Sequence, residues 1–186
     1  MAICYLLPDG SMAHLGIDGS RFNHNPLDVI AHTHALLLED CDALEQIADG
    51  LPNTVDRRLC AEIASHLQYE LPRHHQDEEA GLFPLLKLRS LPGEGLAAIL
   101  DRLVSEHMAD SDFAAEVAEA LELMARGAKV TNPGMTGYML RGFFERYRRH
   151  LHWENTLVLP VARLRLTRDD TAALAAIMQR NRAQSL

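Results

Sequence analysis

Hydrophobic residues recur at the spacing of an amphipathic helix in four long segments of the chain. In each segment, apolar side chains lie three or four residues apart, which places them on one face of a helix. The first stripe, for example, runs through Ile30, Leu37 and Leu44. The pattern predicts long helices over about 26–49, 53–89, 94–126 and 133–164, and a short fifth helix that begins at Thr167.

Helix start signals and one proline refine these boundaries. Asn-Pro pairs at 25–26 and 132–133 combine a good N-cap with a proline suited to the first helical position. Thr167 and Asp170 have the spacing of a capping box for the fifth helix. Pro72 lies inside the second segment, so we expect it to kink that helix or divide it in two.

The pattern predicts an all-α protein. No segment alternates with period two over a useful length, and the four long helices are joined by short connections. Such connections favour an antiparallel up-down four-helix bundle. Residues 1–24 lack a clear period and are expected to form an irregular N-terminal arm. The bundle and its C-terminal helix then occupy residues 25–186 as one domain.

Composition narrows the class of protein. The net charge is −8, with 26 acidic and 18 Lys or Arg residues and no long basic run, so nucleic acid is not an expected partner. No apolar stretch approaches the roughly 18–20 residues of a membrane span, and the N-terminus does not resemble a signal peptide. The three scattered cysteines favour a reducing, cytoplasmic location. The ten histidines are the unusual feature.

An internal repeat selects among the histidines. Segments 74–84 and 150–160, offset by 76 residues, both read His-x-x-x-Glu, then an apolar pair, then proline ten residues after the histidine. A looser match, offset by 73 residues, aligns His34 with His107 on the preceding helices. The closer register pairs His74 with His150, Glu78 with Glu154, and Pro84 with Pro160.

The spacing has a direct chemical reason. Residues i and i+4 lie on one face of a helix, about 5–6 Å apart, so a histidine and a glutamate can reach the same ion or adjacent ions. Neutral imidazole suits Zn, Cu and Fe, and a carboxylate can bridge two ions. Buried carboxylates need compensating charge, which metal cations supply. The core of a helical bundle is a common place for such dinuclear sites.

The combined pattern resembles the hemerythrin-like family of HHE cation-binding domains, over about 26–164. Residues 71–79 followed by 82–84 are similar to its second-helix signature, and 150–160 to its fourth. The resemblance implies a four-helix bundle holding two non-haem irons bridged by oxo or hydroxo and by two carboxylates. Carried over by position, His34 and His74 would bind one iron, His107 and His150 the other, and Glu78 and Glu154 would bridge.

Two departures bear on the function that the resemblance implies. The oxygen carriers of the family have a second histidine on the third helix, one turn from the first, but Leu103, Val104, Asp110 and Ser111 occupy those positions around His107. The carriers also use His-x-x-x-x-Asp on the fourth helix, where this chain has His-x-x-x-Glu. The ligand set is more similar to bacterial members tied to nitric oxide, oxidative stress and iron-sulfur repair than to simple oxygen carriers.

The leading hypothesis is a di-iron protein that binds O2, NO or peroxide, with an electron donor or an iron-sulfur protein as partner. Whether it turns these ligands over as an oxidoreductase is left open. The alternatives are a sensor or storage module without turnover, and a structural bundle that holds Zn, another divalent cation or no metal. Ferritin-like carboxylate proteins are disfavoured because their motif is Glu-x-x-His.

Other residues near the repeat receive weaker interpretations. His66 and Glu70 extend the stripe that ends at Glu78, but a surface or hydrogen-bonding role is favoured over ligation because Glu70 has no counterpart in the second half. Tyr147 is more often a core aromatic than a hydrogen-bond donor to a ligand at the irons, and Cys41 more often an inert buried thiol than a redox partner. The remaining neighbours are expected to be exposed or to hydrogen-bond nearby groups: His32, His75 and His152.

Overall fold

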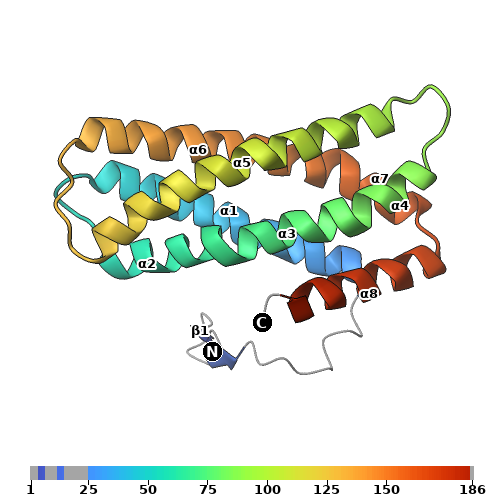
Figure 1. Ribbon diagram of the computed structural model, residues 1–186, viewed down its shortest axis with the longest axis horizontal. Helices are drawn as coiled ribbons and strands as arrows, with labels where there is room; N and C mark the ends of the chain where they lie inside the picture. The colour runs from blue at the N-terminus through green and yellow to red at the C-terminus, as the bar shows by residue number, and fades with distance from the viewer. Residues whose placement is uncertain (1–3, 7–11, 15–24, 185–186) are drawn as a thin grey trace.

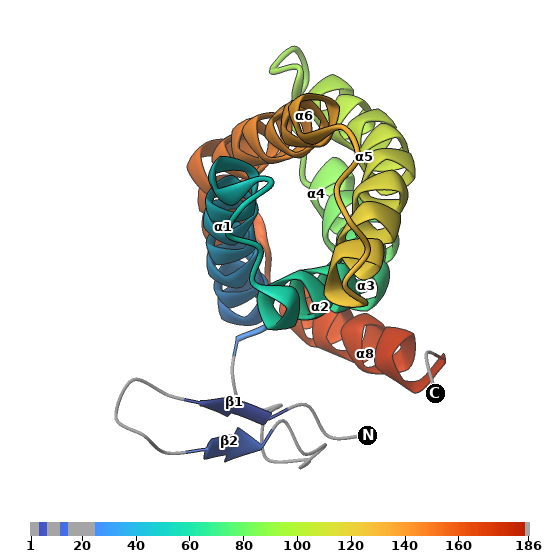
Figure 2. The ribbon, with the colours of Figure 1, turned by 90° about the vertical axis from the view of Figure 1, so that its left-hand side faces the viewer.

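The computed structural model describes residues 4–6, 12–14 and 25–184. Four helical rods run up, down, up and down, and an end-on view shows them around a common axis (Figures 1 and 2). The second and fourth rods contain π-helical turns, labelled η. The elements of the rods are α1 (Pro26–Gly50); α2 (Arg57–Ser65), η2 (His66–Glu70), α3 (Leu71–Asp77), η3 (Glu78–Leu82) and α4 (Phe83–Leu88); α5 (Leu96–Ala125); and α6 (Pro133–Trp153), η4 (Glu154–Val158) and α7 (Leu159–Arg165).

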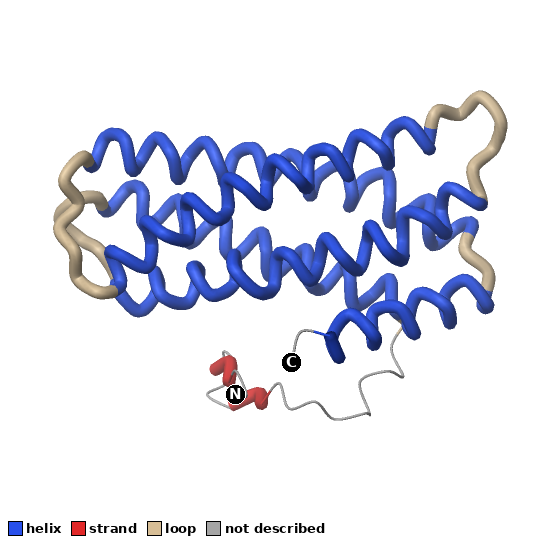
Figure 3. The backbone as a smooth tube through the Cα atoms, in the orientation of Figure 1, coloured by secondary structure: helices blue, strands red, loops and turns tan. Residues whose placement is uncertain are grey.

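The fold class predicted from the sequence is therefore confirmed: the protein is an all-α bundle with an additional C-terminal helix, α8 (Arg168–Gln184). The predicted start signals operate as expected, since the Asn25 side chain accepts a hydrogen bond from the Leu27 amide and Asn132 accepts one from Met135. Short loops join the rods (Figure 3). Among the described residues, none of the helices combines the length and hydropathy needed to cross a membrane.

Each π turn ends two residues before a proline. The amides of Leu71, Phe83 and Leu159 bond to carbonyls five residues back, and Pro72, Pro84 and Pro160 follow them. A proline has no N–H, and its ring clashes with the carbonyl four residues earlier in a regular helix. The wider turn relieves that clash while the chain stays helical. Pro72 thus does separate helical segments, as expected, but the second rod is divided into three α segments by two π turns.

Two apolar clusters fill the bundle and leave a polar layer between them. One cluster includes Leu37, Leu121 and Tyr147, and the other includes Ile30, Leu82 and Leu103. Along α1, Ile30 belongs to one cluster and Leu37 to the other, so the buried His34 lies at the level where the clusters separate. The fold therefore places polar side chains of α1 between two dry cores.

Helix α8 packs against α1, α3 and η3 on the outside of the four rods (Figure 1). Thr167 and Asp170 form the predicted reciprocal capping bonds. The Asp170 carboxylate accepts from the Thr167 amide at 2.9 Å, and the Thr167 hydroxyl accepts from the Asp170 amide at 3.2 Å. Leu174 is fully buried against the second apolar cluster. Asn181 donates to the buried Asp77 carboxylate at 2.8 Å, which fixes the far end of the helix to α3.

The described part of the N-terminal arm contains two short paired strands, which the expectation of an irregular arm did not include. Strands β1 (Cys4–Leu6) and β2 (Met12–His14) pair antiparallel, with Leu6 opposite Met12. Strands of three residues are too short to show a period-two pattern in the sequence. The remainder of the predicted arm lies outside the described residues.

Candidate metal centre

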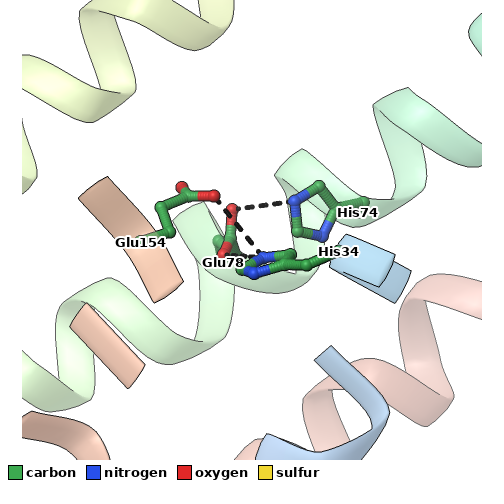
Figure 4. A group of neighbouring side chains, drawn as sticks. All are labelled: His34, His74, Glu78 and Glu154. Atoms are coloured by element: carbon green, nitrogen blue, oxygen red, sulfur yellow. Dashed lines mark hydrogen bonds and ion pairs between the residues drawn. The ribbon is translucent and has the colours of Figure 1, made fainter. Parts of the chain in front are cut away.

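The six side chains selected by the repeat meet in the polar layer. They come from every rod: His34 from α1, His74 and Glu78 from the second rod, His107 from α5, and His150 and Glu154 from the fourth. Each is at most 3% exposed. Figure 4 shows His34, His74, Glu78 and Glu154 pointing toward one another. Both glutamates are the first residue of a π turn, η3 and η4.

Glu154 lies between the two pairs of histidines. Its Oε2 atom is 3.4 Å from Nε2 of His34, and its Oε1 atom is 3.0 Å from Nε2 of His150. Ligand atoms of His34, His74, Glu78 and Glu154 lie within 4.8 Å of one another, as do those of His107, His150 and Glu154. One carboxylate therefore takes part in two adjacent groups of donors.

Glu78 faces both pairs of histidines in a similar way. Its Oε1 atom is 3.4 Å from Nε2 of His34, and its Oε2 atom is 3.3 Å from Nε2 of His74. The same Oε2 atom is 3.5 Å from Nε2 of His107. Two donors at about 2.1 Å from a common ion and at right angles to each other would be about 3.0 Å apart. The observed spacings are close to that value.

The hydrogen bonding of the layer fits bound cations. Nε2 of His107 and Nε2 of His150 are 3.0 Å apart, although both rings turn their Nδ1 atoms toward carboxylates. In neutral rings that donate from Nδ1, two Nε2 lone pairs would face each other, and a shared proton or cation would remove the repulsion. Four buried atoms of the layer make no hydrogen bond of acceptable geometry: His74 Nε2, Glu78 Oε2, and Glu154 Oε1 and Oε2.

Without bound metal, the glutamates and histidines of the polar layer compensate one another's charges. Burial raises the pKa of Glu78 well above its usual value, and the neighbouring Glu154 raises it further. Burial also acts to raise the pKa of Glu154, but the nearby His107 and His150 outweigh it and hold that pKa well below its usual value. Burial acts to lower the pKa of His150, yet the interaction with Glu154 raises it to about 9. Cations would replace these protons.

The outer nitrogens of three histidines are held by residues that the sequence did not single out. Nδ1 of His34 is 2.7 Å from Oδ1 of Asn155. Nδ1 of His107 is 2.8 Å from a Glu79 oxygen, and Nδ1 of His150 is 3.2 Å from a Glu106 oxygen. These partners fix the rings so that each Nε2 faces the centre of the layer. Asn155, Glu79 and Glu106 have one signal in the sequence: each is directly adjacent to one of the six clustered residues.

His75 lies beside the layer without joining it. Its ring stacks on that of His107, with centroids 3.9 Å apart. Its Nδ1 atom is 3.3 Å from the Ser111 hydroxyl, and its Nε2 atom is 3.4 Å from the hydroxyl of Tyr147, whose ring stacks on that of His150. His75 is thus the buried, hydrogen-bonded one of the three neighbouring histidines, while His32 and His152 are exposed.

The remaining neighbours lie apart from the centre. His66 pairs with Asp40 at 2.9 Å, and Glu70 with Arg73 at 3.1 Å, so neither of the upstream residues points into the layer. Cys41 is 1% exposed, and burial raises the pKa of its thiol to about 12, as expected for an inert buried cysteine.

The arrangement offers four imidazole nitrogens and two shared carboxylates between dry cores, which is a donor set for two adjacent transition-metal ions. A search of curated proteins finds no match to this chain. The family model of the hemerythrin HHE cation-binding domain matches residues 25–162, which include all four rods up to α7 and all six clustered side chains. On this match over most of its length, the chain belongs to the hemerythrin HHE cation-binding domain family.

Proposed function

We propose that this protein holds two irons in the polar layer and binds a small ligand there, O2, NO or peroxide. The observation that carries the proposal is the position of Glu154, whose two oxygens face different histidines, His34 on one side and His150 on the other. A carboxylate so placed can bridge two ions. The family is one of cation-binding domains, and the buried atoms that make no hydrogen bond of acceptable geometry give this chain a reason to bind cations.

The donors leave room for a ligand. Two histidines and two shared glutamates supply each position with about four donor atoms, fewer than the six that octahedral ions accept. When bound, the irons would supply the open positions and the one-electron chemistry that O2, NO or peroxide requires. The protein's contribution is to orient the imidazoles through their outer hydrogen bonds and to limit the access of water with the apolar clusters on either side.

Tyr147 is a candidate for a direct contact with that ligand. It is 1% exposed, its ring stacks on His150, and its hydroxyl lies 3.4 Å from His75. The hydroxyl can donate one hydrogen bond, either to His75 or to a ligand between the histidines. Tyr147→Phe tests this role, because it removes the donor and retains the ring.

We assign the protein to the response to oxidative or nitrosative stress, or to iron-sulfur repair, in the cytoplasm. The role in stress or repair is supported by the absence of a second histidine one turn from His107, where Ser111 stands. The cytoplasmic location is supported by the buried thiols Cys41 and Cys60. Partners in this setting would be an electron donor or an iron-sulfur protein. Turnover distinguishes an enzyme from a binding module: steady consumption of NO or peroxide by the iron-loaded protein supports the first, and stoichiometric binding alone supports a sensor or storage module.

Metal analysis with a visible spectrum of freshly isolated protein is the decisive experiment. Two irons per chain with charge-transfer bands of a ferric pair support the proposal, whereas one zinc or no metal would indicate a structural bundle. Glu154→Ala should lose at least one of the two irons. Glu145→Ala, at an exposed position on the same rod, should retain both. Two irons retained in Glu154→Ala would contradict the assignment of the bridge.

A further inference from the structure

The two pairs of histidines are not held alike on their outer sides. His107 and His150 both turn Nδ1 toward carboxylates, Glu79 at 2.8 Å and Glu106 at 3.2 Å. His34 turns Nδ1 toward the neutral amide of Asn155, at 2.7 Å. Within the described chain, the one carboxylate oxygen found within 4.0 Å of a His74 ring nitrogen belongs to Glu78, on the inner side.

An outer carboxylate changes the strength of an imidazole ligand. By accepting the Nδ1 proton in a hydrogen bond, the carboxylate fixes the tautomer and makes Nε2 a more basic donor. Loss of such a partner typically lowers metal affinity by about 10–100-fold. A neutral amide orients the ring in the same way, but it polarises the ring less because it carries no net charge. The His107 and His150 pair therefore has the stronger donors.

Neighbouring charges strengthen the same side. Glu106 is itself held in place by Arg102 at 2.8 Å. The buried Asp110 has one oxygen 4.0 Å from Nδ1 of His150, and its other oxygen pairs with Arg146 at 2.6 Å. The side of the layer formed by α5 and α6 thus carries carboxylates behind both ligands, although Arg102 and Arg146 offset part of their charge.

The inner ligands are shared between the two sides. Glu78 Oε2 lies 3.3 Å from His74 and 3.5 Å from His107, while its Oε1 atom lies 3.4 Å from His34 and gives that side one more donor atom. Glu154 directs one oxygen to each side. All four histidines are at most 3% exposed, so a difference in solvation does not favour either pair. The asymmetry that favours His107 and His150 therefore comes from the outer partners.

We infer that the two ion positions differ in strength: the ion at His107 and His150 binds first and tightly, and the ion at His34 and His74 is the labile one. This inference rests on the proposed dinuclear centre. Glu79 and Glu106 are positioning residues that act through the histidines they hold. The protein can then give up or exchange one ion while the other keeps the layer in place.

Stepwise loading of the metal-free protein with Zn²⁺, followed by NMR of the histidine rings, tests the inference. At one equivalent, signals of His107 and His150 should shift while those of His34 and His74 remain; the second equivalent should shift the latter pair. Isothermal titration should give a second step at least tenfold weaker than the first. Simultaneous shifts of all four rings, or His34 and His74 shifting first, would overturn the inference.

Two variants test whether the outer carboxylates cause the difference between the two ion positions. In Glu79→Gln/Glu106→Gln, which keeps the side-chain shape and removes both charges, the tighter step should weaken by about 10-fold or more and the order of loading should vanish. Asn155→Asp should tighten the weaker step. Glu119→Gln, at an exposed position on α5, is the control and should change neither step. Circular dichroism of each metal-free variant establishes that the bundle is intact.

The outcomes separate this inference from the proposed function. Two ions that bind with an order unaffected by the double variant would refute the role of the outer carboxylates and leave the dinuclear centre standing. A total of one Zn²⁺ per chain would refute the dinuclear centre, and the inference with it.

Discussion

The contact between α8 and the π turn η3 makes a quantitative prediction about Gly81. A Cβ added at this position would lie 2.7 Å from Cδ1 of Leu174 and 3.3 Å from Cγ2 of Ile177. Carbon atoms in favourable contact are about 3.5–4.0 Å apart, so Gly81→Ala creates an overlap of about 1 Å with a fully buried leucine. Helix α8 must move away, or Leu174 must change rotamer.

The expected magnitude combines two opposing effects. Overpacking of this kind costs about 1–3 kcal/mol. Replacing a helical glycine by alanine returns about 1 kcal/mol through backbone entropy. Gly81→Ala should therefore lower the free energy of unfolding by about 0–2 kcal/mol. Gly142→Ala is the control: its Cβ would meet Phe113 at 3.4 Å, an ordinary contact, so the entropic gain should dominate.

A double-mutant cycle with Leu174→Ala separates packing from propensity. Leu174→Ala alone should cost about 2–5 kcal/mol, because Leu174 is buried against the second apolar cluster. In that background the clashing methyl is gone, so Gly81→Ala should become stabilising by about 1 kcal/mol. Urea unfolding of the metal-free proteins gives the coupling energy, expected at about 1–3 kcal/mol. Additivity within about 0.5 kcal/mol would refute the reasoning.

Three further predictions concern metal, pH and thiols. Zn²⁺ at about 100 times its Kd should raise the free energy of unfolding by about 2.7 kcal/mol, seen as a higher Tm that a chelator reverses. The hydrogen bond to Asp40 raises the pKa of His66. The stability that this pair contributes is therefore complete below about pH 6.5 and is lost as the pH rises through the raised pKa. The urea unfolding midpoints of Asp40→Asn should lack this part of the pH dependence. Burial raises the pKa of Cys41 to about 12 and of Cys60 to about 11, so a thiol reagent at about pH 8 should label the folded Cys4→Ala variant only as fast as it unfolds.

The sequence predicted the rods well because helical periodicity is a local signal. The first helix was expected over about 26–49 and is Pro26–Gly50; the third was expected over about 94–126 and is Leu96–Ala125. The i,i+4 relation is also local, so the repeat could choose His74 with Glu78 from a run that contains His75 and Glu79. Bringing the four rods onto one axis then followed from the bundle.

The outer partners could not be predicted in the same way because their contacts join different rods. Glu79 lies on η3 and holds His107 on α5, and Glu106 lies on α5 and holds His150 on α6. Neighbours in sequence point about a quarter of a turn apart on a helix, so adjacency to a ligand does not indicate a shared partner. These contacts depend on which rods are neighbours and on the height at which their residues face each other. Helical periodicity contains neither kind of information.

The prolines of the repeat show why the motif is longer than its ligand pair. Pro84 and Pro160 each follow a π turn whose first residue is a clustered glutamate, Glu78 or Glu154. π turns are frequent at functional sites, so the candidate metal centre alone could be taken as their cause. The third π turn argues otherwise, because η2 precedes Pro72 and begins at His66, which pairs with Asp40 away from the centre. Proline is the feature common to all three turns, so the proline ten residues after each repeated histidine widens the helix at the glutamate, and the polar layer uses a distortion that proline imposes.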